Sequence, residues 1–134
     1  MIRGTSMTKI MELDREDFDE VINNCDQMVI VEFYTNSCPN CKNMEPIYTN
    51  LAETMGNKAR FCRVNAQLHQ EIAMLYGVQS VPTFKFFCHR KPIGEIVGAV
   101  NKTILKNTIV DFGQWREKCF KGSTPISYDM TGYV

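Results

Sequence analysis

Residues 28–41 read MVIVEFYTNSCPNC. The run from Met28 to Tyr34 is apolar, β-branched and aromatic without a breaker, which is typical of a central strand covered on both faces. Pro39 follows at a position where a helix can begin, because its missing N–H costs nothing at the first helical residue and its fixed φ suits the turn. This stretch therefore predicts a strand that leads directly into a helix, with Cys38 and Cys41 at the junction.

The two cysteines of this stretch share one helical turn, so their thiols can close into a disulfide and open again. A helix N-terminus carries a partial positive charge and unpaired N–H groups, and it therefore favours the thiolate of Cys38, the nucleophile in thiol–disulfide exchange. Cys41 lies one turn further along, where it would be more buried and would resolve a mixed disulfide formed on Cys38. We interpret the two residues as a redox-active pair.

The whole chain has 134 residues, enough for one domain with a substantial core. Hydrophobic residues make up 44% and charged residues 22%, which is ordinary for a globular protein. The 15 basic and 15 acidic residues cancel, which argues against a nucleic-acid partner, because such binders normally carry a basic stripe. The segment from Met1 to Asp14 has no apolar block long enough for a signal peptide or a membrane span. We therefore expect a cytoplasmic protein without a membrane partner.

Hydrophobic periodicity and breaker residues predict the remaining elements. Further strands are expected at residues 9–13, 60–65, 83–88 and 93–97. Helices are expected at residues 14–24, 39–56, 68–76 and 102–118. A turn over residues 89–92 joins the last two strands into an antiparallel hairpin. The order β-α-β-α-β-α-β-β-α places helices on both faces of the sheet and the ligand site at the carboxyl ends of the strands. We interpret residues 1–8 as a leader or expression tag, 9–119 as the domain and 120–134 as a tail.

The other four cysteines, Cys25, Cys62, Cys88 and Cys119, are scattered singly along the chain. Apolar neighbours predict that Cys62 and Cys88 are core thiols that behave as small hydrophobes. We interpret Cys119 as an exposed and inert thiol. The spacing therefore argues against a disulfide scaffold.

From about Ile10 to Phe112 the chain resembles the thioredoxin family in several separate motifs. These motifs are residues 29–34, the pair Cys38 and Cys41, Lys42 followed by Pro46, Tyr76-Gly77-Val78, Val81-Pro82-Thr83 and Val97-Gly98-Ala99. The resemblance implies an α/β thioredoxin fold, a central mixed sheet of about five strands with helices on both faces. It also implies that Pro82 is cis and lies against the active-site sulfurs.

Three residues depart from the usual family pattern. Ser37 stands where the family has a Trp, which removes an aromatic face from the substrate rim. Pro39 and Asn40 replace the usual Gly-Pro between the cysteines. Glu32 replaces the buried Asp beneath the redox pair. Because Asn40 puts no positive charge beside Cys38, we expect a redox potential on the reducing side.

The resemblance also implies roles around the redox pair. Glu32 is the candidate proton carrier for Cys41, since desolvation raises a buried carboxyl pKa toward neutrality. The alternative is a partly exposed strand glutamate, or one paired with a lysine such as Lys58. Val81 would present its backbone to an extended substrate segment. The residues expected to contact substrate are Ser37, Pro39, Asn40, Val81, Gly98 and Ala99.

The leading functional prediction is a protein-disulfide reductase that acts in electron transport and cell redox homeostasis. We expect a monomer that is recharged by a thioredoxin reductase and binds no cofactor itself, because no G-x-G-x-x-G motif follows a strand. No metal site is expected, since one CxxC supplies only two of the four usual ligands, although a dimer could share a cluster. A glutathione-dependent, glutaredoxin-like reductase and a thioredoxin-fold interaction module without turnover stay open as alternatives.

Overall fold

The computed structural model describes residues 10–24 and 27–120. The expected leader and nearly all of the expected tail lie outside these residues. The strands are β1 (Met11–Glu12), β2 (Met28–Tyr34), β3 (Ala59–Asn65), β4 (Thr83–Cys88) and β5 (Lys91–Val97). The helices are α1 (Arg15–Asn24), α2 (Pro39–Thr54), α3 (Gln70–Leu75) and α4 (Lys102–Phe120). The predicted order of elements is confirmed.

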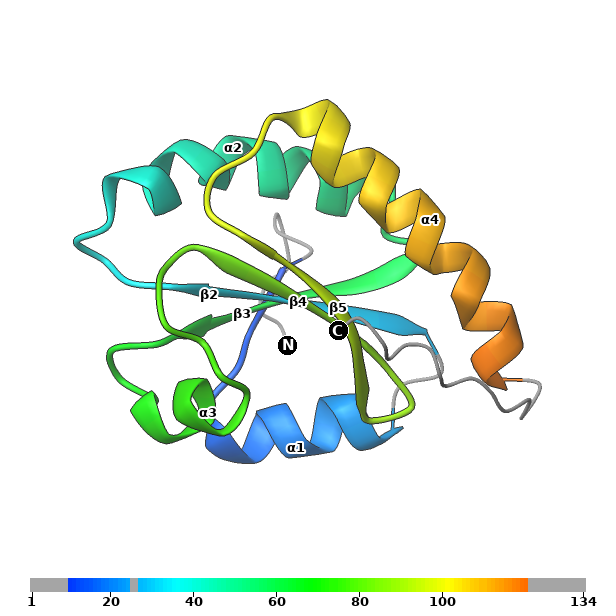
Figure 1. Ribbon diagram of the computed structural model, residues 1–134, viewed down its shortest axis with the longest axis horizontal. Helices are drawn as coiled ribbons and strands as arrows, with labels where there is room; N and C mark the ends of the chain where they lie inside the picture. Colours follow the sequence, from blue (N-terminus) through cyan, green and yellow to red (C-terminus); the bar gives the residue numbers. More distant parts are fainter. Residues whose placement is uncertain (1–9, 25–26, 121–134) are drawn as a thin grey trace.

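The five strands form one mixed sheet in the order β1-β3-β2-β4-β5. β1, β3 and β2 run parallel, whereas β4 lies antiparallel to both β2 and β5. Helices α2 and α4 cover one face of the sheet and α1 and α3 cover the other (Figure 1). This arrangement confirms the expected α/β fold and buries every residue of β2.

The hairpin between β4 and β5 differs from its prediction. Its turn consists of His89 and Arg90 alone, which have φ angles of 52° and 73°. Positive φ at both central residues matches the twist of the flanking strands in a two-residue hairpin. Pro92 therefore belongs to β5 and not to the turn. β5 is an edge strand, where a residue without an N–H does not interrupt the ladder of hydrogen bonds.

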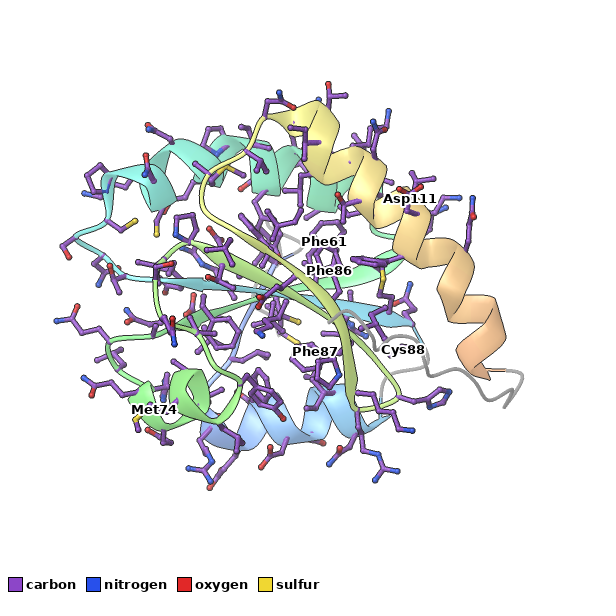
Figure 2. All side chains as sticks on the ribbon, in the orientation of Figure 1. Phe61, Met74, Phe86, Phe87, Cys88 and Asp111 are labelled. Atoms are coloured by element: carbon purple, nitrogen blue, oxygen red, sulfur yellow. The ribbon has the colours of Figure 1, made fainter. Side chains whose placement is uncertain are left out.

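Apolar side chains form one core on each face of the sheet. The core under α2 and α4 includes Ile30, Tyr48, Leu51, Phe61, Phe84, Phe86, Leu105 and Ile109. The core over α1 and α3 includes Phe18, Val31, Phe33, Val64, Ile72 and Phe87. Figure 2 shows this division, with Phe61 and Phe86 on the α4 side and Phe87 on the α1 side. The buried Tyr48 hydroxyl donates to the carbonyls of Cys62 and Ile30 at 2.7 and 3.2 Å, which ties α2 to β3 and β2.

The two cysteines that were expected to be core thiols differ in the structure. Cys62 is fully buried and retains its thiol, as predicted. Cys88 is also buried, but it is disulfide-bonded, so its interpretation as a core thiol is wrong. Apolar neighbours report burial only, whereas a disulfide depends on the distance and direction of a second Cβ. Cys25 and the side chain of Cys119 lie outside the described part of the chain.

Within residues 10–24 and 27–120, no helix has both the length and the apolar character needed to cross a membrane.

Candidate active site

Cys38 and Cys41 lie where the end of β2 leads into α2. Cys38 is the N-cap of α2, with an extended backbone at φ −86° and ψ 114°, and Pro39 is the first residue of the helix. The backbone N–H of Cys41 donates to Sγ of Cys38 at 3.0 Å. Both thiols are free, and their residues are 9% and 3% exposed respectively. Cys38 is thus the more accessible sulfur and the one that receives the helix N–H.

A second chain segment, the loop before β4, lies against Cys38. The peptide bond between Val81 and Pro82 is cis. Sγ of Cys38 lies 3.7 Å from the carbonyl oxygen of Val81 and donates to it. The Pro82 carbonyl in turn accepts from the N–H of Gly98 at 2.7 Å. The loop before β4 therefore contacts Cys38 on one side and the residue after β5 on the other.

Gly98 follows β5 and has a φ of 95°, a conformation that residues with a Cβ rarely adopt. Its turn carries the chain past Pro82 and leaves Ala99 exposed. Ser37, Pro39 and Asn40 are also exposed beside the cysteines. Of the residues that were expected to contact substrate, Ser37, Pro39 and Asn40 adjoin Cys38 in sequence and Val81 contacts its sulfur, whereas Gly98 is linked to this region through Pro82.

Glu32 lies within β2 and is 1% exposed. Its Oε2 is buried and has no hydrogen-bond partner among the described residues. Burial raises the pKa of Glu32 from 4.5 to about 7, although the charge of Arg63 opposes the shift. The alternative interpretation of a partly exposed strand residue is therefore wrong.

Cys41 lies deeper than Cys38, and its environment raises the pKa of its thiol. Burial is the main reason why the pKa of Cys41 is raised, and the hydrogen bond with Cys38 adds to the effect. The negative charges of Cys38 and Glu32 raise it further. A base within reach of Cys41 would therefore have to remove this proton before its sulfur could attack.

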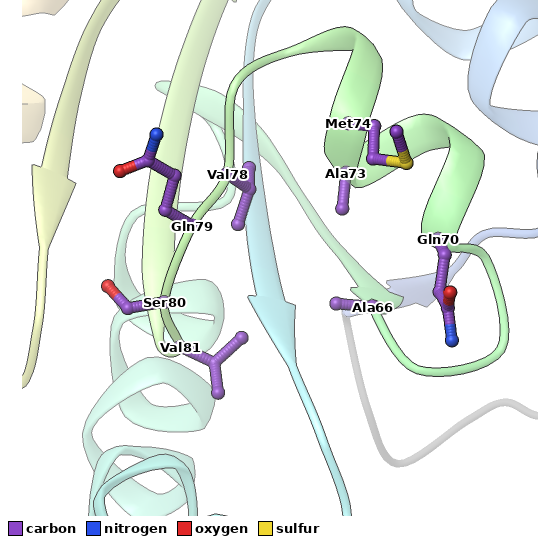
Figure 3. Close-up of a pocket in the computed structure, with 8 residues that line it drawn as sticks. All are labelled: Ala66, Gln70, Ala73, Met74, Val78, Gln79, Ser80 and Val81. Carbon is purple, nitrogen blue, oxygen red and sulfur yellow. The ribbon is translucent and has the colours of Figure 1, made fainter.

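A pocket of about 290 Å³ lies beside the loop before β4 (Figure 3). It is lined by Ala66, Gln70, Ala73, Met74, Val78, Gln79, Ser80 and Val81. Val81 is shared by the pocket and by the Cys38 contact, so the pocket adjoins Cys38.

Sequence reasoning did not predict this pocket. Met74, on its wall, is 78% exposed, and the neighbouring Leu75 is 69% exposed. The sequence holds one sign of this exposed apolar surface. Met74 and Leu75 are adjacent on a short helix, and two neighbouring helical residues cannot both face the core.

Among the residues that the structure describes, no group of three or more His, Cys, Asp or Glu side chains is placed to hold a metal ion.

The comparisons with known proteins agree with this geometry. The Thioredoxin family model matches residues 9–111. The solved structure of a point mutant of a thioredoxin from Halobacterium salinarum superposes with a TM-score of 0.72 at 27% identity, over 78% of this chain and 91% of the other. The chain belongs to the thioredoxin family.

Two relatives show how far the similarity extends. A thioredoxin of Buchnera aphidicola is 31% identical over 100 residues, which are 75% of this chain and 93% of that protein. A chloroplastic M-type thioredoxin of Triticum aestivum is 32% identical over 103 residues, or 77% of this chain. The chain spans 58% of the wheat protein and 63% of its counterpart from Zea mays.

Proposed function

We propose that this protein is a thiol–disulfide oxidoreductase that reduces protein disulfides through Cys38 and Cys41. The observation that carries the proposal is the 3.0 Å hydrogen bond from the N–H of Cys41 to Sγ of Cys38 at the start of α2. This N–H, together with the positive end of the helix dipole, stabilises a negative charge on the Cys38 sulfur. Membership of the thioredoxin family supports the same activity.

The reaction proceeds in two exchanges. The Cys38 thiolate attacks one sulfur of the substrate disulfide and forms a mixed disulfide with it. The substrate S–S bond breaks, and the other substrate sulfur leaves as a thiolate that takes up a proton. Cys41 then loses its proton and attacks the Cys38 sulfur of the mixed disulfide. The substrate sulfur that was bonded to Cys38 leaves as a thiolate, and two electrons have passed from the cysteine pair to the substrate. The pair is left as a Cys38–Cys41 disulfide.

Glu32 is the proposed proton acceptor for Cys41 in the second exchange. Its carboxyl has a pKa of about 7, so both of its protonation states are populated near neutral pH. A group whose pKa lies near the working pH is well suited to general acid–base catalysis. The negative charge of Glu32 also raises the pKa of Cys41, so the two groups influence one another.

The proposed substrate surface surrounds Cys38. We assign it to Ser37, Pro39, Asn40, Val81, Gly98 and Ala99. An extended substrate segment would lie along the backbone of Val81 as an additional strand. The adjoining pocket would receive a side chain of that segment, and it has Met74 and Val78 on its wall.

The oxidised Cys38–Cys41 pair must regain two electrons after each cycle. We propose a thioredoxin reductase as the donor, a monomer as the working form and the cytoplasm as the location.

The wheat and maize relatives are chloroplastic by name, and Cys88 is disulfide-bonded. Cell fractionation therefore tests the location directly, and recovery of the protein mainly from an oxidising compartment would contradict it.

Reduction of insulin disulfides by dithiothreitol tests the activity. The protein at micromolar concentration should accelerate the precipitation of insulin chains, and the Cys38→Ser/Cys41→Ser variant should give only the uncatalysed rate. A parallel reaction with glutathione as the reductant tests the glutaredoxin-like alternative. If the wild-type protein does not exceed the double variant with either reductant, the proposed function is wrong.

A further inference from the structure

Three charged side chains lie in a row across three neighbouring strands. Register in the sheet pairs Glu12 of β1 with Arg63 of β3, and Arg63 with Glu32 of β2. Paired residues of parallel strands point to the same face of the sheet. Ile30 and Phe61, two positions before Glu32 and Arg63, pack in the core under α2, so α2 covers this face. Arg63 therefore has a carboxyl group on each side, one toward the edge of the sheet and one toward its centre.

The guanidinium of Arg63 pairs with the outer carboxyl groups. Its Nε lies 3.5 Å from Oε1 of Glu12, and its Nη2 lies 3.6 Å from Oε2 of Glu45 on α2. Its Cζ lies 3.9 Å from the centre of the Tyr34 ring. The Tyr34 hydroxyl donates to Oε2 of Glu12 at 2.7 Å. Three neighbours thus surround one cation, although its Nε forms no hydrogen bond among the described residues.

The inner carboxyl has no such partner. Within the described residues Glu32 forms no ion pair, and its Oε2 has no hydrogen-bond partner. The side chains of Glu12 and Glu45 are 54% and 55% exposed, whereas Glu32 is 1% exposed. Exposed carboxyl groups ionise at little cost in water, so they compete well for the guanidinium, whereas ionising Glu32 carries a desolvation cost.

The groups that act electrostatically on Glu32 come from β1, β3 and α2. They are Glu12 of β1, Arg63 of β3, and Cys41, Glu45 and Tyr48 of α2. On the β4 side its register partner is Phe84, which carries no charge. Arg63 is the single cation of this set, and the charges of Glu45 and Glu12 oppose its effect on the pKa of Glu32.

We propose that Glu12 and Glu45 are positioning residues for proton transfer at the active site, because they hold Arg63 against Tyr34 and leave the buried Glu32 carboxyl without a counter-ion. The inference rests on the proposed role of Glu32 in thiol–disulfide exchange. Burial is the main reason why the pKa of Glu32 is raised, and the charges of Glu45 and Glu12 raise it further against the opposing charge of Arg63. Without them, the cluster is a lone cation that would pair with Glu32 and ionise it.

The test replaces the outer glutamates by glutamine and follows the protonation of Glu32. In Glu12→Gln the new amide oxygen would still accept from Tyr34, so the substitution removes the charge and keeps the hydrogen bond. The carboxyl carbon of Glu32 is observed by carbon-13 NMR in selectively labelled protein, and it is assigned as the resonance that is missing in Glu32→Gln. The matched control is Glu71→Gln, which removes a 51% exposed glutamate that pairs with Arg15 on the opposite face.

We expect the Glu12→Gln/Glu45→Gln variant to lower the titration midpoint of Glu32 by about 1 to 3 pH units, the range for a carboxyl that gains a close cation. Each single substitution should lower it by less, Arg63→Gln should raise it, and Glu71→Gln should leave it unchanged. A midpoint in the double variant that equals that of the Glu71→Gln control, or lies above it, would overturn the proposal.

Disulfide reduction is measured separately on the same proteins. In the double variant the acid limb of the pH–rate profile should shift to lower pH by the same amount as the NMR midpoint of Glu32. A moved midpoint with an unmoved rate profile would refute the role of Glu32 in proton transfer and with it this inference. Absence of turnover in the wild-type protein would refute the proposed function, and the NMR midpoints would still report how Arg63 is held.

Discussion

Sγ of Cys38 lies 3.7 Å from the carbonyl oxygen of Val81, although the two residues are 43 positions apart in the chain. The contact places Cys38, the proposed nucleophile, directly beside the backbone that would pair with an incoming substrate segment. A disulfide bound along Val81 would therefore present its sulfur to Cys38 before it could reach Cys41, which is 3% exposed. This geometry supports the proposed order of the two exchanges.

Replacement of Cys41 by Ser should stop the reaction after the first exchange. Cys38 then keeps the substrate as a mixed disulfide, because no second thiol is placed to displace it. Incubation with an oxidised protein substrate and non-reducing electrophoresis should show one new band of summed mass, which disappears with dithiothreitol. The matched variant Cys38→Ser should form no such band. Equal trapping by both variants would show that the roles of the two cysteines are not distinct.

Glu32 should make the stability of the protein depend on pH. Its pKa is about 7 in the folded state and 4.5 without burial. Between these values the folded state holds a proton that the unfolded state has released, so stability falls as the pH rises through that window. A shift of this size corresponds to about 3 kcal/mol.

Urea denaturation at pH 5 and pH 8 measures this dependence. From pH 5 to pH 8 the free energy of unfolding of the wild-type protein should fall by up to about 3 kcal/mol more than that of Glu32→Gln, because the amide does not titrate. Both proteins are compared with the cysteine pair in the same oxidation state, so that only the glutamate differs. Equal losses in the two proteins would mean that Glu32 does not titrate in this range.

Met74 offers a test of the pocket beside Val81. Its side chain lines the pocket and is 78% exposed, so Met74→Lys should leave the fold intact. For a peptide disulfide with a leucine near its cysteine, we expect KM to rise by about 3- to 10-fold, since one apolar contact of about 1 kcal/mol is lost. The value of kcat should not change.

Leu75→Lys is the control for the pocket. Leu75 is 69% exposed on the same helix but does not line the pocket. Its KM should stay at the wild-type value. Equal effects of the two substitutions would show that charge on α3 matters and that the pocket does not.

Much of this fold follows from local patterns in the sequence. The breaker-free run of β2, the proline at the start of α2 and the apolar run of β4 each specify their element from neighbouring residues. Cys38 and Cys41 are found for the same reason, because the chemistry of the pair depends on a single turn of helix.

The features that sequence reasoning missed all depend on contacts between distant segments. Arg63 lies beside Glu32 only because β2 and β3 pair in one particular register. Pro92 fits within β5 because that strand has no neighbour on one side. The pocket forms between α3 and the loop before β4, which leaves no periodic signature in either segment.

The disulfide of Cys88 should stabilise the fold without taking part in the redox reaction. Cys88 ends β4, whereas the active site lies at the Thr83 end of the same strand, about 17 Å away at the usual rise per residue. Cys88→Ser should lower the free energy of unfolding by about 2 to 4 kcal/mol, the usual effect of removing a native disulfide. The initial rate of insulin reduction should be unchanged.

The control for Cys88 is made in a background where Cys38 and Cys41 are both serine, so that only the second disulfide responds to reductant. Urea denaturation of this background protein should shift to lower midpoint when dithiothreitol is added. When Cys88→Ser is added to this background, the urea midpoint should already be low without dithiothreitol and should not change when dithiothreitol is added. If dithiothreitol leaves the background protein unchanged, the Cys88 disulfide does not contribute to stability.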